Sequence, residues 1–396
     1  MLNVNKIKYG LLYTYLIAYL FLPMFVKDLS MLGVLKIFLA TLLCVLLYKK
    51  NSGSSNSKSI FRMILPLFVF FVTAQFLCFH SMLAVKFAVN VIFFLFFALY
   101  SDSLLAQKFA AGVKVMALSI VIIALYYCLV NGQLYFFRSE ILIEKQTMSI
   151  VLCLASTFCL VEGSFAGLRL KNMILLVLFL LANLFIIQSK TALFVLAIDV
   201  VALCLIHKQF YVWLKGKVVY FAAVFVLFLS LLPSIVLPDD IRFGVNRLTG
   251  CEIFSTQYDR SVERMDMTYS IRDDVRKYCF SLFLQNPLMG IGLGNFERYN
   301  KYSNTSVKQL IQPESQWLGI LCEGGVVYVG IFFVFFMVNM KNSYNVLKKD
   351  VTNVFALNSF MLQLNYSIMF IFNDFLDSLF WFSTGIFLGA MKNRKK

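Results

Sequence analysis

The sequence predicts an all-α membrane protein with about twelve transmembrane helices and one large loop outside the cytoplasm. Hydrophobic residues make up 60% of the 396 positions and charged residues only 14%, against about 25% charged residues in a soluble domain. The apolar residues come in runs close to the roughly 20 residues with which a helix crosses the hydrocarbon layer. A membrane barrel would instead show alternating segments of about ten residues, so the chain is built from helices.

The apolar spans follow one another along the whole chain. The first span lacks a small-residue cleavage site and is followed at once by the second, so it is expected to be a membrane helix rather than a removable signal peptide. We place the spans at residues 9–26, 29–48, 60–79, 82–99, 111–130, 148–165, 171–187, 191–206, 218–236, 315–338, 355–372 and 375–391.

The lysines and arginines of the short loops indicate the orientation, because cytoplasmic loops are enriched in both. With the N-terminus in the cytoplasm, the cytoplasmic segments carry twenty basic residues, and the short outer loops carry four. Both termini are therefore expected in the cytoplasm. Since most of the net charge of +16 is then an orientation signal, we expect no nucleic-acid partner.

The spans divide the chain into three parts. Residues 1–236 hold the first nine transmembrane helices, residues 237–314 form the large outer loop with short helices, and residues 315–396 hold the last three transmembrane helices. The loop contains ten basic and ten acidic residues, and seven of the basic residues are arginines. Arginine is suited to phosphate, which it binds through two parallel hydrogen bonds.

One helix is expected inside this loop. Ser270 and Asp273 resemble a capping box and predict a helix over residues 271–285, which Asn286 and Pro287 end. Arginines spaced by multiples of four along this stretch lie on one helical face in pairs: Arg260 with Arg264, and Arg272 with Arg276.

The cysteines predict no metal site. Most of them lie inside apolar runs, and no CxxC spacing occurs. Cys251 and Cys279 are the cysteines of the loop, and a disulfide between them is left open for an oxidising compartment.

A glycine-rich segment, NPLMGIGLGNF, fills residues 286–296. Its glycines allow close backbone approach to a phosphate or sugar, which makes Gly292, Gly294 and Asn295 candidate binding residues. The segment is no dinucleotide fingerprint, because no strand precedes it. The alternative is a tight re-entrant turn packed on helices.

Two charged residues stand at the outer ends of spans. Glu314 precedes the tenth span, where a carboxylate is suited to take a proton from an attacking sugar hydroxyl. The alternative is an acid that interacts favourably with a helix N-terminus. Lys190, in the short connection at 188–191, is a candidate pyrophosphate ligand, and the alternative is an ordinary interface lysine. Glu323 is expected to be a structural partner of a buried donor.

Charges also occur inside the spans, where they are costly unless they are paired or hydrated. Lys36, Lys86 and Asp199 must therefore face the bundle interior or a wet cavity, and an ion pathway in a transporter stays open. The sequence contains no HExxH or Walker motif and no suitable acidic pair, so we expect neither a metal ion nor another cofactor.

In this order, the motifs resemble the superfamily of O-antigen polymerases and ligases. Ser189, Lys190 and Thr191 open a span, Arg272 precedes the glycine segment, and PESQW leads into a helix with Glu323, Gly324 and Gly325. The motifs cover about residues 185–335, and the topology covers the whole chain.

Two departures bear on the choice within the superfamily. Ligases resemble a pattern with histidine at the start of the helix after the large loop, where this chain has Glu314. This difference favours a polymerase. The family often has arginine in the position of Lys190, which keeps the charge but loses the bidentate fork.

The resemblance implies a metal-independent glycosyltransferase of the GT-C type in the bacterial inner membrane. It would transfer a growing glycan from undecaprenyl diphosphate to a sugar hydroxyl of an incoming lipid-linked repeat unit. The implied partners are the lipid-linked donor and acceptor, membrane lipid and a chain-length regulator protein. The catalytic roles fall to Arg272 and Glu314. The implied substrate-binding residues are Arg276, Arg264, Arg260, Lys190, Gly292, Gly294 and Asn295.

Other functions remain open. A ligase would transfer the finished glycan to the lipid A core, and another glycan ligase or a capsule polymerase would use similar substrates. A flippase for lipid-linked oligosaccharides should show repeated halves and a cationic cavity without a long outer loop. In a structural or export-accessory membrane protein the arginines would be incidental.

Overall fold

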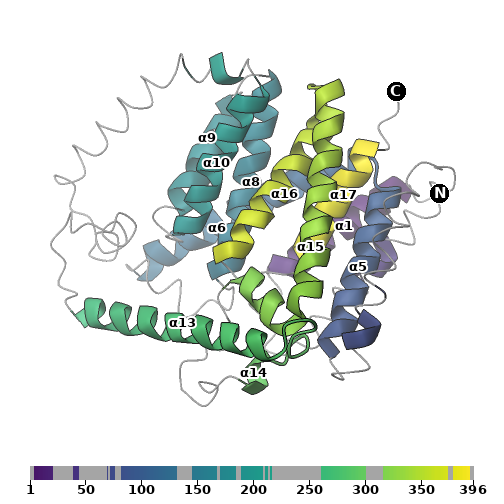
Figure 1. Cartoon of the computed structure of the whole chain (residues 1–396). Helices are drawn as coiled ribbons and strands as arrows, with labels where there is room; N and C mark the ends of the chain where they lie inside the picture. Colours follow the sequence, from purple (N-terminus) through teal and green to yellow (C-terminus); the bar gives the residue numbers. More distant parts are fainter. Residues whose placement is uncertain are drawn as a thin grey trace. The chain divides into compact units, whose positions relative to one another are not determined.

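A computed structural model of the chain shows helices joined by turns throughout its described part (Figure 1). The described residues are 4–20, 39–43, 69, 72–75, 82–131, 145–166, 170–183, 189–207, 210–212, 215, 260–299, 315–372 and 378–392. The helices in this part, in chain order, are α1 (Val4–Leu20), α5 (Met82–Tyr100), α6 (Ser103–Asn131), α8 (Lys145–Ala166), α9 (Leu170–Leu181), α10 (Lys190–Ile206), α13 (Arg260–Gln285), α14 (Phe296–Tyr299), α15 (Gln316–Lys349), α16 (Val354–Phe372) and α17 (Ser378–Lys392).

Nine of the spans expected from the sequence coincide with helices of the described part: α1, α5, α6, α8, α9, α10, α15, α16 and α17. The spans at 29–48, 60–79 and 218–236 lie mostly outside the described residues. Four described segments are long and apolar enough to cross a membrane, namely Ser103–Tyr126, Thr147–Phe165, Gln316–Lys349 and Val354–Ile371. The chain is therefore a multi-pass helical membrane protein, and the number of twelve spans stays a prediction.

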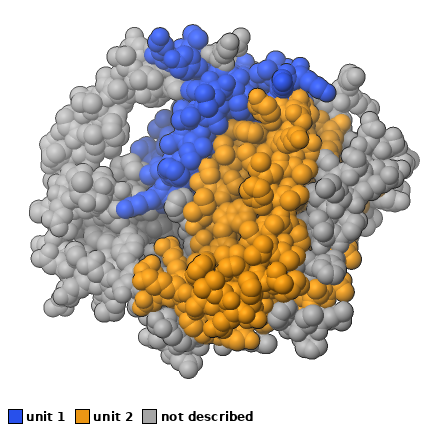
Figure 2. Space-filling model, in the orientation of Figure 1, with its two compact units in different colours: residues 1–40, 107–259, 347–358 blue, residues 41–106, 260–346, 359–396 orange. Residues whose placement is uncertain are grey.

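Two compact units, interleaved along the sequence, make up the chain (Figure 2). Unit 1 comprises residues 1–40, 107–259 and 347–358, and unit 2 comprises residues 41–106, 260–346 and 359–396. In unit 1, α8 packs against α9 and α10. In unit 2, α5 packs along α17.

Unit 2 has a core of aromatic side chains. The buried ring of Trp381 lies 5.6 Å from Phe87, 5.6 Å from Phe335 and 5.9 Å from Phe332, measured between ring centroids. Small residues let α17 approach α5, because a β-carbon at Gly389 would collide with the carbonyl oxygen of Phe97. The core therefore combines aromatic packing with close backbone contact.

Unit 1 holds its polar side chains between helices. Asp199 of α10 is fully buried, and its Oδ2 atom lies 2.5 Å from the hydroxyl of Thr157 on α8. Nearer the N-termini of both helices, the hydroxyl of Ser149 donates to that of Ser189 over 2.7 Å. Asp199 thus faces the helix bundle, as expected for a charge in a span. The side chains of Lys36 and Lys86 lie outside the described residues.

Helix α13 corrects the expected start of the loop helix. It begins at Arg260, eleven residues before the predicted start, so Ser270 lies inside the helix and not at its N-terminus. The upstream residues include Arg, Glu and Met, which favour helix. Asp273 pairs with Lys277 one turn later, over 2.7 Å, instead of completing a capping box. The expected end is confirmed, since α13 stops at Gln285.

Candidate functional site

The loop arginines share one continuous helix. Arg260, Arg264, Arg272 and Arg276 all belong to α13, which appears as the long helix beside α14 in Figure 1. The side chain of Arg276 is exposed, and the side chains of the other three lie outside the described residues. Because one helix carries all four arginines, their spacing along α13 is fixed.

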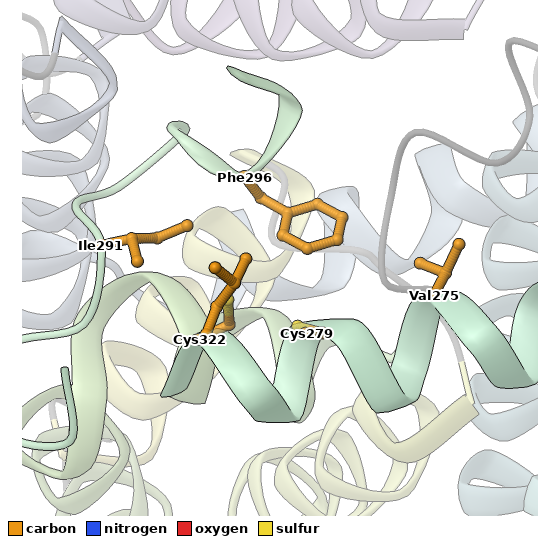
Figure 3. Close-up of a cluster of buried hydrophobic side chains, with 6 residues drawn as sticks. Val275, Cys279, Ile291, Phe296 and Cys322 are labelled. Carbon is orange, nitrogen blue, oxygen red and sulfur yellow. The ribbon is translucent and has the colours of Figure 1, made fainter. Parts of the chain in front are cut away.

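The C-terminal half of α13 packs against the beginning of α15. Val275, Cys279 and Leu282 of α13 form a buried cluster with Ile291, Phe296 and Cys322 (Figure 3). The thiol of Cys279 is in no disulfide and donates to the carbonyl oxygen of Leu318 over 3.6 Å. Cys279 therefore serves packing, and the disulfide left open with Cys251 is not formed at this thiol.

An ion pair lies on the exposed side of α13. The hydrogen bond and charge of Lys277 lower the pKa of Asp273, and the same contact with Asp273 raises the pKa of Lys277. The ammonium group of Lys277 is thus engaged by a carboxylate of its own helix. Arg276 stands beside Lys277 in sequence and is likewise exposed.

The glycine segment is inserted into a break in α15. In an unbroken helix, the N–H groups of Val326 and Val327 donate to the carbonyl groups four residues earlier. Here those two N–H groups donate to Pro287 and Leu288, over 2.9 and 3.3 Å. The carbonyl groups of Cys322 and Glu323 accept instead from Ile291 and Gly292, over 3.0 and 2.9 Å. The segment and the helix exchange four backbone hydrogen bonds, which satisfies the broken helix.

Glycine is required at two positions of this contact. Gly290 and Gly325 both have a φ of 67°, in the region that other residues rarely adopt. A β-carbon at Gly325 would collide with the carbonyl group of Leu288, and one at Gly290 would collide with the backbone of Glu323. The re-entrant turn considered for this segment is therefore present, and its glycines allow the turn and helix to touch.

The amide groups of the turn are largely used within the protein. The N–H group of Gly292 donates to Glu323, and that of Asn295 donates to Gly292 over 3.1 Å. The side chain of Asn295 donates to the carbonyl group of Ile291 over 3.0 Å. Gly292 thus has a structural role here, while the binding of a substrate by Gly292, Gly294 and Asn295 stays a prediction.

Glu323 has the structural role expected for it. Its Oε1 atom accepts the backbone N–H of Phe296, the first residue of α14, over 3.2 Å. Nearby, the hydroxyl of Tyr278 donates to the carbonyl group of Tyr299 over 2.7 Å. These contacts fix α14 between α13 and α15.

Gln75 is a contact of the turn that the sequence did not reveal. Its side chain is fully buried; the amide nitrogen donates to Met289 over 3.1 Å, and the amide oxygen accepts from Leu293 over 2.9 Å. The sequence signal for this contact is an amide side chain inside an apolar run. Burying such an amide costs free energy unless it is hydrogen-bonded, so it indicates a partner.

Helix α15 begins next to Glu314. The hydroxyl of Ser315 accepts the N–H of Leu318 over 3.4 Å, as in an N-cap, and donates to the carbonyl group of Phe370 on α16 over 3.4 Å. Trp317 adds a second link, since its indole N–H donates to Ser367 over 3.1 Å. Glu314 itself lies outside the described residues, so both interpretations of this acid stay predictions.

Lys190 belongs to unit 1 and is the first residue of α10. Its side chain is exposed, and Ser189 caps the helix by accepting the N–H of Ala192 over 3.3 Å. A lysine is electrostatically unfavourable at a helix N-terminus unless an anion is present. Whether Lys190 shares a site with the arginines of unit 2 stays a prediction.

The arrangement suits anionic substrates. A helix with four arginines leads into a rigid turn, which is bonded to the first turns of α15, and an acid precedes that helix. Guanidinium groups stabilise a phosphate leaving group, and a carboxylate can accept a hydroxyl proton. Basic residues on α13 and an acid before α15 are therefore the residue types that a transfer reaction with a phosphate leaving group uses.

Part of the chain matches a family of known proteins. Residues 175–335 match the family described as O-antigen ligase. The matched region runs from α9 into α15 and includes α10, α13 and the glycine turn. It confirms the resemblance to the O-antigen polymerase and ligase superfamily and indicates a glycosyltransferase-like enzyme of O-antigen or polysaccharide assembly. A search of curated proteins gave no match.

Proposed function

We propose that the chain is a surface-polysaccharide polymerase, which transfers a growing glycan from undecaprenyl diphosphate to a sugar hydroxyl of an incoming lipid-linked repeat unit. The proposal rests on the packing of α13 against the start of α15, within the region that matches the O-antigen ligase family. The three-part division of the chain, with a large outer loop, cytoplasmic termini and twelve spans, belongs to the same proposal.

Chain distances support a common site for the arginines and Glu314. Cys279 contacts Leu318. Arg276 is three residues before Cys279 on α13, and Glu314 is four residues before Leu318. Both Arg276 and Glu314 therefore lie within four residues of this contact, each on its N-terminal side.

In the proposed reaction, the bond between the anomeric carbon and the diphosphate oxygen breaks, and a bond from that carbon to the acceptor oxygen forms. The acceptor hydroxyl gives its proton to Glu314, which acts as general base. Arg272 and Arg276, with Arg260, Arg264 and Lys190, stabilise the negative charge of the departing lipid diphosphate. No metal ion has a role in this scheme.

A ligase is the second candidate, because the matched family is described as O-antigen ligase. Such an enzyme would use the same lipid-linked donor and transfer the glycan to the lipid A core. The chain contains two histidines, His80 and His207, and neither lies near the start of α15 in sequence. The histidine pattern of ligases is thus missing where Glu314 stands, which favours the polymerase.

Deletion of the gene separates these functions. The surface polysaccharide of the deletion strain is compared by gel electrophoresis with that of the same strain carrying the wild-type gene. A polymerase leaves a single capped repeat unit after deletion, whereas a ligase leaves unattached polymer on its lipid carrier. An unchanged ladder of chain lengths would exclude both.

A further inference from the structure

Gln75 joins two parts of unit 2 that are 214 residues apart in sequence. It is the last described residue of a short helical stretch at 72–75, within the third span expected from the sequence. None of its surface is exposed. Both ends of its side-chain amide are hydrogen-bonded to the glycine turn, one to Met289 and the other to Leu293.

These two bonds lie on either side of two glycines that have a positive φ. Gly290 and Gly292, with φ of 67° and 96°, lie between Met289 and Leu293. The intervening N–H groups of Ile291 and Gly292 are bonded to α15. The turn is therefore held by the backbone of α15 and, independently, by the side chain of Gln75, which is distant in sequence.

The chemistry of the contact is specific to an amide. A primary amide offers a donor and an acceptor on one rigid plane, which is what one carbonyl group and one N–H group of the turn demand. Methionine has a similar length but offers neither strong group, and asparagine is too short by one methylene. An ionised carboxylate has no hydrogen to donate to Met289.

We infer that Gln75 is a positioning residue for the transfer reaction, which fixes the turn at 286–296 and, through Leu293, the neighbouring residues Gly294 and Asn295. The inference rests on the proposed function, in which this turn borders the substrates. Gln75 touches no substrate in this scheme. It acts by holding the turn in register with α15, so that the end of α13 and its arginines keep their place beside the start of α15.

The decisive variant is Gln75→Met, and Gln363→Met is its matched control. Gln363 lies in α16, also in unit 2, and is also fully buried. Within the described part of the chain, however, neither its Nε2 nor its Oε1 atom has a hydrogen-bond partner. The two substitutions thus remove equally buried amides, only one of which is bonded to the turn.

We expect Gln75→Met to enter the membrane fraction at the wild-type level and to lower polymer formation by about ten- to a hundredfold, as is usual when positioning contacts are lost. Hydrogen exchange of the purified protein should increase in the peptide covering residues 288–296 and stay unchanged in α16. Gln363→Met should resemble the wild type in both measurements.

Gln75→Glu adds a readout that a purely structural role would not change. A protonated carboxyl group restores both hydrogen bonds, and a buried carboxyl group takes up a proton more readily than an exposed one. The activity of this variant on lipid-linked repeat units, extracted from the deletion strain, should therefore rise relative to wild type as the pH falls. Dividing the activity of Gln75→Glu by that of the wild type at each pH removes the effect of titratable groups that both proteins share, such as Glu323.

These measurements test the positioning role of Gln75 separately from the proposed polymerase function. Normal polymer in Gln75→Met, or an equal loss in Gln363→Met, would overturn the positioning role even if the wild type polymerises. Increased exchange of the turn with unchanged polymer would also overturn it. If the wild type itself fails to lengthen the glycan, the proposed function fails, whereas the exchange measurement still reports whether Gln75 holds the turn.

Discussion

The backbone N–H of Ile291 donates to the carbonyl oxygen of Cys322 over 3.0 Å, and thereby takes the place that Val326 holds in an unbroken helix. Val326 in turn donates to Pro287 over 2.9 Å. Because each partner satisfies the groups that the other leaves open, the loop segment and the membrane helix are one structural element. Changes on either side should therefore affect both.

Gly325→Ala tests this element. Alanine at this position would need a φ of 67°, which costs about 1–3 kcal/mol, and its β-carbon would collide with the carbonyl group of Leu288. We expect a lower melting temperature of the purified protein and a loss of polymer. Both are measured, by thermal unfolding in detergent and by gel electrophoresis of the polysaccharide.

Gly330→Ala is the matched control on the same helix. No atom lies within 4 Å of a β-carbon built at Gly330, so alanine should fit and stabilise the helix by about 0.5–1 kcal/mol. If both variants melted at the wild-type temperature, the break in α15 would not need glycine.

Glu323 should tolerate glutamine better than leucine. The Oε1 atom of Glu323 accepts the N–H of Phe296, and glutamine keeps such an acceptor. Leucine leaves this N–H unpaired, at a cost of about 1–3 kcal/mol where it is buried. Polymer formation and melting temperature should thus be close to wild type in Glu323→Gln and reduced in Glu323→Leu. An equal loss in Glu323→Gln and Glu323→Leu would make the charge of Glu323, rather than its hydrogen bond, the important property.

Arg276 and Lys277 are neighbours with different expected roles. Both are exposed cations on α13, but Lys277 is paired with Asp273 over 2.7 Å. If the arginines bind the lipid diphosphate, Arg276→Ala should shorten the glycan ladder and raise the donor concentration needed for half-maximal rate. Lys277→Ala should leave both unchanged. Equal effects of the two substitutions would indicate a general effect of charge on α13.

The pair of Asp273 and Lys277 should also be insensitive to pH across the usual working range. Its carboxyl pKa is lowered and its ammonium pKa is raised by the same contact. A lowered carboxyl pKa means that the stabilisation is present above about pH 4, the ordinary value for aspartate, and is lost as the pH falls through the folded value. The difference in hydrogen exchange of α13 between wild type and Asp273→Asn should be constant from about pH 5 to 9. It should shrink below about pH 4, where Asp273 takes up a proton, and again above about pH 10, where Lys277 loses its proton. A change in this difference near neutral pH would contradict the pairing.

Much of the fold follows from hydropathy, but the connection of loop to helix does not. The segments that form α5, α8 and α16 are predominantly apolar, so their ends could be predicted to within a few residues. The sequence indicates the break in α15 only weakly. Its two glycines, Gly324 and Gly325, are no evidence of a break, because glycine is also common in unbroken membrane helices. Its partner lies about thirty-five residues earlier in sequence, at 287–292, and no local pattern connects the two.

The loop helix shows how a local signal can mislead. Ser270 and Asp273 have the spacing of a capping box, but the residues before them also favour helix and continue it to Arg260. The alternating glycines are compatible with the packed turn as one of two alternatives, whereas the charged residues inside the spans give no indication of Gln75. An uncharged amide in an apolar run carries the same demand for a partner.

Asp199 distinguishes an enzyme from an ion-coupled transporter. This fully buried residue contacts the hydroxyl of Thr157 over 2.5 Å, and asparagine at position 199 could keep that hydrogen bond in either direction. In an enzyme the contact is structural, so Asp199→Asn should form polymer at the wild-type level. Asp199→Leu should have a lower melting temperature and form less polymer. A transporter that moves protons through this carboxyl group would behave differently, because asparagine cannot release a proton near neutral pH. Loss of polymer in Asp199→Asn, with normal insertion and an unchanged melting temperature, would therefore favour the transport function over glycosyl transfer.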